Sequence, residues 1–129
     1  MSEYHYTVTT NKTVEQTIQD LENVLKEDKF GILWKFEIHK KLAEKGLNAS
    51  KNITVLEVCN PEEAHGMLEK DPMTSYFLPC KMVVTEEGDH TKVGLVRPTT
   101  LIGLMEQEGL NQVAKNIEDR LIHSIDKAI

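Results

Sequence analysis

The residues of this chain best suited to chemistry are its two cysteines, Cys59 and Cys80. The first opens the stretch Cys59-Asn60-Pro61, and the second is followed by Lys81. Asn60 is a residue type that begins helices, and the amide groups at a helix start favour a thiolate on a neighbouring cysteine. That effect amounts to about 0.3–1 kcal/mol, less than about one pKa unit. A thiol with an ordinary pKa of about 8.5 therefore stays mostly protonated at neutral pH.

The sequence leaves three uses of these cysteines open. They can be small apolar residues at strand ends, a paired thiol site for redox chemistry or sulfur transfer, or metal ligands. Metal binding needs a third and a fourth ligand, and the sequence has no Cys-x-x-Cys and no His-x-x-x-His element. His65, on the helix after Cys59, is the nearest candidate. We therefore expect no metal and no cofactor.

The predicted elements around the cysteines are a strand, a helix and a second strand. Residues 53–58 are β-branched and apolar on both faces, which is typical of a central strand. Asn60 as N-cap and Pro61 at the first helical position predict a helix that stops before Pro72. A strand follows over residues 82–85.

Whether the two thiols meet depends on how the chain returns from this helix. A parallel crossover would leave Cys59 and Cys80 at opposite ends of the sheet, about 20 Å apart. The extended segment 73–79 could instead carry the chain back to the end where Cys59 lies. The sequence leaves both paths open.

The other elements follow from capping and periodicity. A capping box, Thr13 with Gln16, predicts an amphipathic helix, and Gly88-Asp89 predicts a turn between two strands. A short helix is expected to end at Gly46, and apolar residues every four positions predict a terminal helix capped by Asn111. Together these elements indicate one α+β domain over residues 1–129. We expect a mixed or antiparallel sheet of about five strands with amphipathic helices packed on it.

The segment 30–38 has the strongest apolar alternation in the chain. Phe30, Ile32, Trp34, Phe36 and Ile38 alternate without a break and include the only tryptophan. This pattern predicts a strand whose apolar face makes the centre of the core. An aromatic platform for a ligand is the functional alternative.

Composition restricts the classes of partner. The chain of 129 residues carries a net charge of −6, so neither duplex nucleic acid nor an anionic membrane surface is expected as its main partner. No apolar run approaches the roughly 18 residues needed to span a bilayer, and the N-terminus has no signal-peptide pattern. We therefore expect a cytoplasmic protein with both cysteines as free thiols.

Several of these segments together resemble the family known as domain of unknown function 302. The similarity covers nearly the whole chain, from Tyr4 to Ile129, and is most specific in Cys-Asn-Pro followed by Leu-Pro-Cys. The segments that carry the similarity are Phe30-Gly31-Ile32-Leu33, Lys45-Gly46-Leu47, Cys59-Asn60-Pro61 with Ala64 and Met67-Leu68, Asp71-Pro72, Leu78-Pro79-Cys80 and Val83-Val84. The resemblance implies a compact α+β domain and a homodimer, and it implies no established reaction. Lys81 replaces the uncharged residue of the family pattern, which argues against a site that needs a neutral environment there.

The sequence contains no recognisable catalytic set. We therefore predict a protein that is not an enzyme, a small-ligand-binding or assembly module with a pocket near Cys59 and Cys80. The predicted ligand or thiol site comprises Cys59, Asn60, Pro61, Cys80 and Lys81. The alternative is a thiol-based redox or sulfur-carrier protein that uses the two cysteines.

Overall fold

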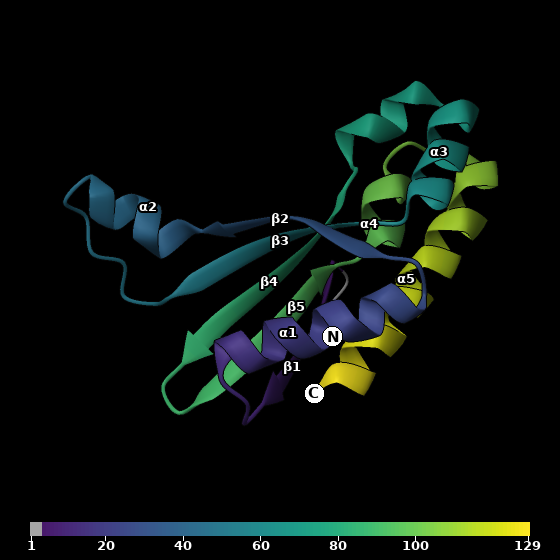
Figure 1. Ribbon diagram of the computed structural model, residues 1–129. Helices are drawn as coiled ribbons and strands as arrows, with labels where there is room; N and C mark the ends of the chain where they lie inside the picture. The colour runs from purple at the N-terminus through teal and green to yellow at the C-terminus, as the bar shows by residue number, and fades with distance from the viewer. Residues whose placement is uncertain (1–3) are drawn as a thin grey trace.

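Five antiparallel strands form one sheet in the computed structural model, which describes residues 4–129. The strand order is β1-β5-β4-β3-β2, and each neighbouring pair is antiparallel (Figure 1). The strands are β1 (His5–Thr10), β2 (Gly31–Glu37), β3 (Ile53–Cys59), β4 (Cys80–Glu87) and β5 (His90–Val96). The helices are α1 (Val14–Glu27), α2 (Ile38–Glu44), α3 (Pro61–Lys70), the 3-10 helix η1 (Pro72–Tyr76), α4 (Pro98–Gly103) and α5 (Glu108–Ala128). The predicted α+β class is confirmed.

The start of α1 and the two turns form where the sequence predicts them. The backbone N–H of Gln16 donates to Thr13 Oγ1 at 3.1 Å, which satisfies one free amide at the start of α1. Gly46 follows α2 with φ of 77°, and Gly88 lies between β4 and β5 with φ of 62°. Both glycines adopt left-handed backbone conformations that a side chain would disfavour.

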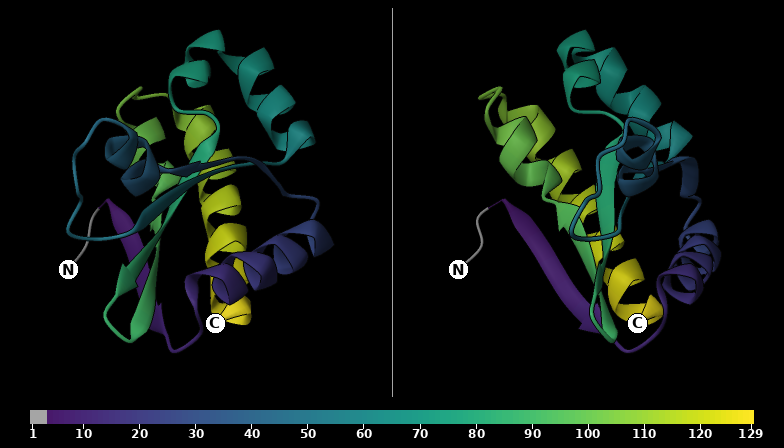
Figure 2. Two further views of the ribbon diagram at one scale, coloured as in Figure 1. Left: turned by 60° about the vertical axis from the view of Figure 1, so that its left-hand side comes forward. Right: turned by 90° about the vertical axis from the view of Figure 1, so that its left-hand side faces the viewer.

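One face of the sheet is covered by α1 and α5 and carries the core (Figure 2). Alternate residues of the three inner strands are fully or almost fully buried there: Leu56 and Val58 of β3, Met82 and Val84 of β4, Val93 and Leu95 of β5. They pack in one cluster with buried helix residues such as Leu21, Leu25, Leu121 and Ile125. Each such side chain contributes about 1.5–3 kcal/mol by leaving water, so this layer is the main source of stability.

The alternating segment 30–38 does not make the centre of the core. Only Phe30 is buried, at 3% exposure, whereas Trp34 is 51% exposed. A β-bulge explains the difference: Ile32 pairs with Val58, but Trp34 pairs with the next residue along, Glu57. The extra residue, Leu33, moves every later side chain of β2 to the other face of the sheet.

Trp34 and Phe36 therefore lie on the face opposite α1 and α5. Phe36 pairs with Val55, whose side chain points to the same face. The two rings are stacked, with centroids 5.0 Å apart and an interplanar angle of 7°. The prediction of buried aromatic residues at these positions is wrong because β2 is an edge strand with a bulge.

Residues 33–52 form a segment that we call the arm, because it extends beyond the body of the domain. Figure 1 shows α2 at the far end of β2 and β3, apart from the other helices. No residue of α2 is buried. Residues 34–37 of the arm pair with β3 within the sheet. The start of α2 is held to β3 through His39, whose Nδ1 accepts a hydrogen bond from the backbone N–H of Ile53 at 3.0 Å.

The terminal helix begins earlier than predicted. Helix α4 begins directly at Pro98, and α5 begins at Glu108 with Gln107 as its N-cap residue. Asn111, the predicted cap, lies within the first turn of α5. The apolar stripe of α5 starts with Leu110, so the periodicity identified the helix but not its first residue.

Candidate functional site

The two cysteines lie at the same end of the sheet. Cys59 is the last residue of β3 and Cys80 the first of β4, and the two strands are antiparallel neighbours. The chain returns through α3 and η1, so the path that would separate the thiols is not taken. Cys80 pairs with Val58, one residue before Cys59, so the two side chains leave the sheet from opposite faces. Both thiols are free.

Burial keeps both thiols protonated. Burial raises the pKa of Cys80 to about 12, with a smaller contribution from the nearby Cys59, and it also raises the pKa of Cys59. Desolvation therefore outweighs any stabilisation of a thiolate by the start of α3. The reactive form of a cysteine is the thiolate, so neither residue is activated as a nucleophile.

Asn60 acts as the N-cap of α3. Its side-chain oxygen accepts from the backbone N–H groups of Glu62 and Glu63 at 3.0 and 3.1 Å, and the residue is 5% exposed. Pro61 occupies the first helical position, as predicted. The carbonyl oxygen of the Asn60 side chain is therefore engaged in capping.

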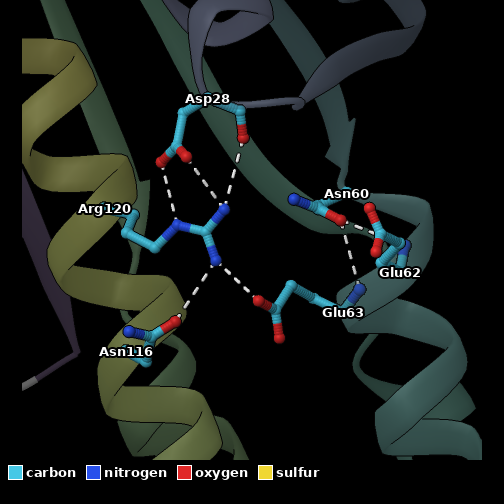
Figure 3. A network of polar contacts seen from close by, with 6 residues as sticks. All are labelled: Asp28, Asn60, Glu62, Glu63, Asn116 and Arg120. Atoms are coloured by element: carbon cyan, nitrogen blue, oxygen red, sulfur yellow. Dashed lines mark hydrogen bonds and ion pairs between the residues drawn. The ribbon is translucent and has the colours of Figure 1, made fainter.

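Beside the cysteines lies an ionic network that the sequence did not reveal (Figure 3). Arg120 of α5 donates from Nε and Nη2 to both carboxylate oxygens of Asp28, at 2.8 and 2.9 Å, and from Nη1 to Glu63 at 2.6 Å. Its guanidinium also lies 5.0 Å from the ring centroid of Phe30. The hydrogen bonds from Arg120 hold the pKa of Asp28 below its usual value. The network joins the end of α1 and the start of α3 to α5, through partners that no local motif relates.

A cavity of about 380 Å³ lies on the Cys80 side of this region. Its wall is mainly apolar and comes from α3, the segment before β4, α4 and α5; it includes Met67, Phe77, Leu78, Leu101, Ile102 and Ile117. Glu57 and Lys81, which pair across β3 and β4, contribute charge to the lining. Cys80 lies in the same wall.

A second, much smaller cavity adjoins Cys59. It has a volume of about 10 Å³ and is lined by Cys59, Asn60 and Cys80 among others. Such a space holds about one water molecule at most. Of the five predicted site residues, Cys80 and Lys81 thus line the larger cavity, Cys59 and Asn60 line only the smaller one, and Pro61 lines neither.

The molecule has a larger hollow elsewhere, but its lining is charged. About 600 Å³ lies between α1, β2 and the start of α2, with Glu15, Glu22, Lys35, Glu37 and Lys40 around it. Ligand pockets are mostly apolar with a few polar groups. The cavity of about 380 Å³ beside Cys80 fits this description better than the charged hollow does.

Among residues 4–129, no group of three or more histidine, cysteine, aspartate or glutamate side chains is placed to hold a metal ion. Within the same range, no helix is both long and apolar enough to cross a bilayer.

The fold and the sequence together define the family. The fold is that of an α+β domain with an antiparallel open sheet. The model of the family "Domain of unknown function DUF302" matches residues 6–128, and the chain belongs to this family. It is similar to a solved structure described as an uncharacterized conserved protein DUF302 from Bacillus stearothermophilus, with a TM-score of 0.95 and 43% identity. That match covers 99% of this chain and 100% of the other. No curated protein matches the chain.

Proposed function

We propose that this protein is a non-catalytic module that binds a small, largely apolar molecule in the cavity beside Cys80, and that it acts as a cytoplasmic homodimer. The cavity of about 380 Å³ carries the proposal, because ligand sites commonly have volumes of about 300–1,000 Å³ and mainly apolar walls. Phe77, Leu101 and Ile102 would contact the apolar part of the ligand. Lys81 would pair with an anionic head group.

The chemistry of the cavity wall supports binding rather than catalysis. Its titratable side chains, within the described part of the chain, are Glu57, Tyr76, Cys80 and Lys81. The cysteine has a pKa of about 12 and stays protonated. General acid–base catalysis instead favours groups with pKa values near the working pH. Saturable turnover of a defined substrate would overturn this part of the proposal.

Binding can be tested with the fluorescent probe 8-anilinonaphthalene-1-sulfonate, which combines an apolar ring system with one anionic group. We expect saturable binding to the folded protein and competition by octanoate. Leu101→Trp should weaken binding by about tenfold or more, because the larger ring fills space that the probe needs. Leu104→Trp is the matched control, since Leu104 is 71% exposed and outside the cavity lining.

The outcomes of this experiment test both the location of the binding site and the class of ligand. Equal binding by wild type and Leu101→Trp would place the probe elsewhere and overturn the proposed site. Absence of saturable binding by wild type would overturn the choice of ligand class. Circular dichroism and urea unfolding of both variants would establish that they are folded.

The second candidate is a thiol function, favoured by the position of both cysteines at one end of the sheet. Hydrogen peroxide would then oxidise the two thiols to one disulfide and form two water molecules, with the loss of two hydrogen atoms from the protein. The raised pKa values of Cys59 and Cys80 argue against it. Mass spectrometry after peroxide treatment tests whether the two thiols are oxidised. Unmodified thiols at neutral pH would eliminate this function.

A further inference from the structure

The arm presents apolar side chains that residues 4–129 leave exposed or only partly covered. Leu33, Trp34 and Leu47 are 61%, 51% and 57% exposed, and Phe36 and Ile38 are only half-buried. Trp34 and Phe36 are stacked on each other on the open face of the sheet. The stacked pair of Trp34 and Phe36 is an exposed apolar group of the kind found at protein–protein contacts.

The backbone of β2 is also free to pair. This strand is at the end of the sheet, and within residues 4–129 no strand lies on the outer side of its seven residues. Edge strands are usually protected by charge or by a bulge, and β2 has its bulge at Leu33 and two charged residues, Lys35 and Glu37. Residues 34–37 after the bulge keep a regular register. Both charged side chains point to the same face, because Lys35 pairs with Leu56 and Glu37 with Thr54.

We propose that two copies of this chain associate by antiparallel pairing of β2 with β2, about a two-fold axis at Phe36. In this register Phe36 lies opposite Phe36 of the second copy, and Lys35 lies opposite Glu37 of the second copy, twice. The strand pairing covers residues 35–37 of each copy, because α2 begins at Ile38, and Trp34 then lies beside the start of α2 of the second copy. A register centred on Lys35 would place the two lysines against each other, which costs stability. The charge pattern therefore selects the register at Phe36.

The charge of the arm is consistent with a second copy as the partner. The arm, residues 33–52, contains five lysines and two glutamates, a net charge of +3. The whole chain carries −6, so the remainder carries −9. Three of the five lysines already pair within one copy, Lys40 with Glu37, Lys41 with Glu44 and Lys51 with Glu87. The excess positive charge of the arm still favours approach to a second, acidic copy.

This inference rests on the homodimer of the proposed function and names the surface that forms it. Sedimentation equilibrium of the full chain should give twice the mass of 14.7 kDa. Lys35→Glu and Glu37→Lys should each raise the dissociation constant of the dimer by about tenfold, because both symmetric pairs become like-charged. The double variant, Lys35→Glu with Glu37→Lys, restores opposite charges and should return to within about threefold of wild type.

Two further variants complete the test. Trp34→Glu should weaken the dimer more than either charge reversal, while its exposed position leaves the fold of the single copy intact. Lys70→Glu, on the exposed surface of α3, is the matched control and should change nothing. Raising the salt concentration should reduce the effects of the single reversals.

The outcomes distinguish a failure of the proposed β2 contact from a failure of the proposed homodimer or of ligand binding. A mass of 14.7 kDa at all concentrations would overturn both the homodimer and this surface, while the binding of the fluorescent probe is measured independently. A dimer that tolerates Trp34→Glu and both charge reversals would keep the homodimer and overturn the arm as its contact. Single reversals that weaken the dimer without rescue in the double variant would overturn the two-fold register.

Discussion

Removal of the Arg120 guanidinium provides a quantitative test of how the helices are held together. Arg120→Met retains an aliphatic stem against Phe30 but loses every hydrogen bond to Asp28 and Glu63. The arginine side chain is 25% exposed, Asp28 43% and Glu63 31%, so water screens both ion pairs. The screening makes each pair closer in strength to a surface pair than to a buried one.

The expected loss follows from these exposures. Two screened charge pairs contribute about 1 kcal/mol each, and the contact of the guanidinium with the Phe30 ring adds about 0.5–1 kcal/mol. Arg120→Met should therefore lower the free energy of unfolding by about 2.5–3 kcal/mol at pH 7. The loss stays below the roughly 3–5 kcal/mol of a fully buried pair, because water can reach the two carboxylates that remain.

The pH dependence of the stability difference between wild type and Arg120→Met provides a second test of this prediction. Hydrogen bonds from Arg120 lower the pKa of Asp28 in the folded protein. The resulting stabilisation is complete above the unfolded pKa of about 3.9 and is lost as the pH falls through the lower, folded value. The difference in stability between wild type and Arg120→Met should therefore shrink as the solution is acidified below about pH 4.

Urea unfolding at pH 7 and near pH 3 measures both effects. Lys115→Met is the matched control, since Lys115 forms an exposed ion pair with Asp119 within one helix and should lose less than about 0.5 kcal/mol. A double-mutant cycle with Asp28→Asn should give a coupling of about 1 kcal/mol. The reasoning is refuted if Arg120→Met loses no more than the control, or if its loss is the same at both pH values.

Three more perturbations test the cap, the thiols and the core. Asn60→Ala removes both capping bonds of α3 and should cost about 1–2 kcal/mol by urea unfolding, whereas Asn60→Asp should retain most of it. Iodoacetamide at pH 7.5 should label Cys59 before Cys80. The rate of Cys80 labelling should rise about tenfold per pH unit toward its pKa of about 12. Peptide mapping that finds Cys80 labelled first would contradict the burial argument. Leu21→Ala, at a side chain with no exposed surface, should lose about 2–5 kcal/mol in urea unfolding, and a loss below 1 kcal/mol would contradict its place in the core.

Local patterns predicted the elements that local chemistry determines. The caps at Thr13 and Asn60 follow from hydrogen bonds within one turn, so the residue types alone located both helix starts. The turn at Gly88 follows from a backbone conformation that glycine adopts without strain. Each of these features depends on residues only a few positions apart.

Features that depend on distant residues were beyond such patterns. The alternation from Phe30 to Ile38 predicted a buried face, but the bulge at Leu33 is set by pairing with β3 and is not visible in the segment itself. The meeting of the two cysteines at one end of the sheet depends on the return path through α3 and η1. The network around Arg120 joins residues from three separate helical regions, so no spacing rule could locate it.

The bulge at Leu33 also affects how this protein can change over evolutionary time. Deletion of that single residue would restore strict alternation, and Trp34 and Phe36 would then rotate to the side of the sheet that faces α1. A one-codon deletion could thereby remove the aromatic surface without altering any of its side chains. Amino-acid replacement would need several steps for the same result, so length variation at this position is the simplest route by which the surface proposed here for the pairing of two copies is gained or lost.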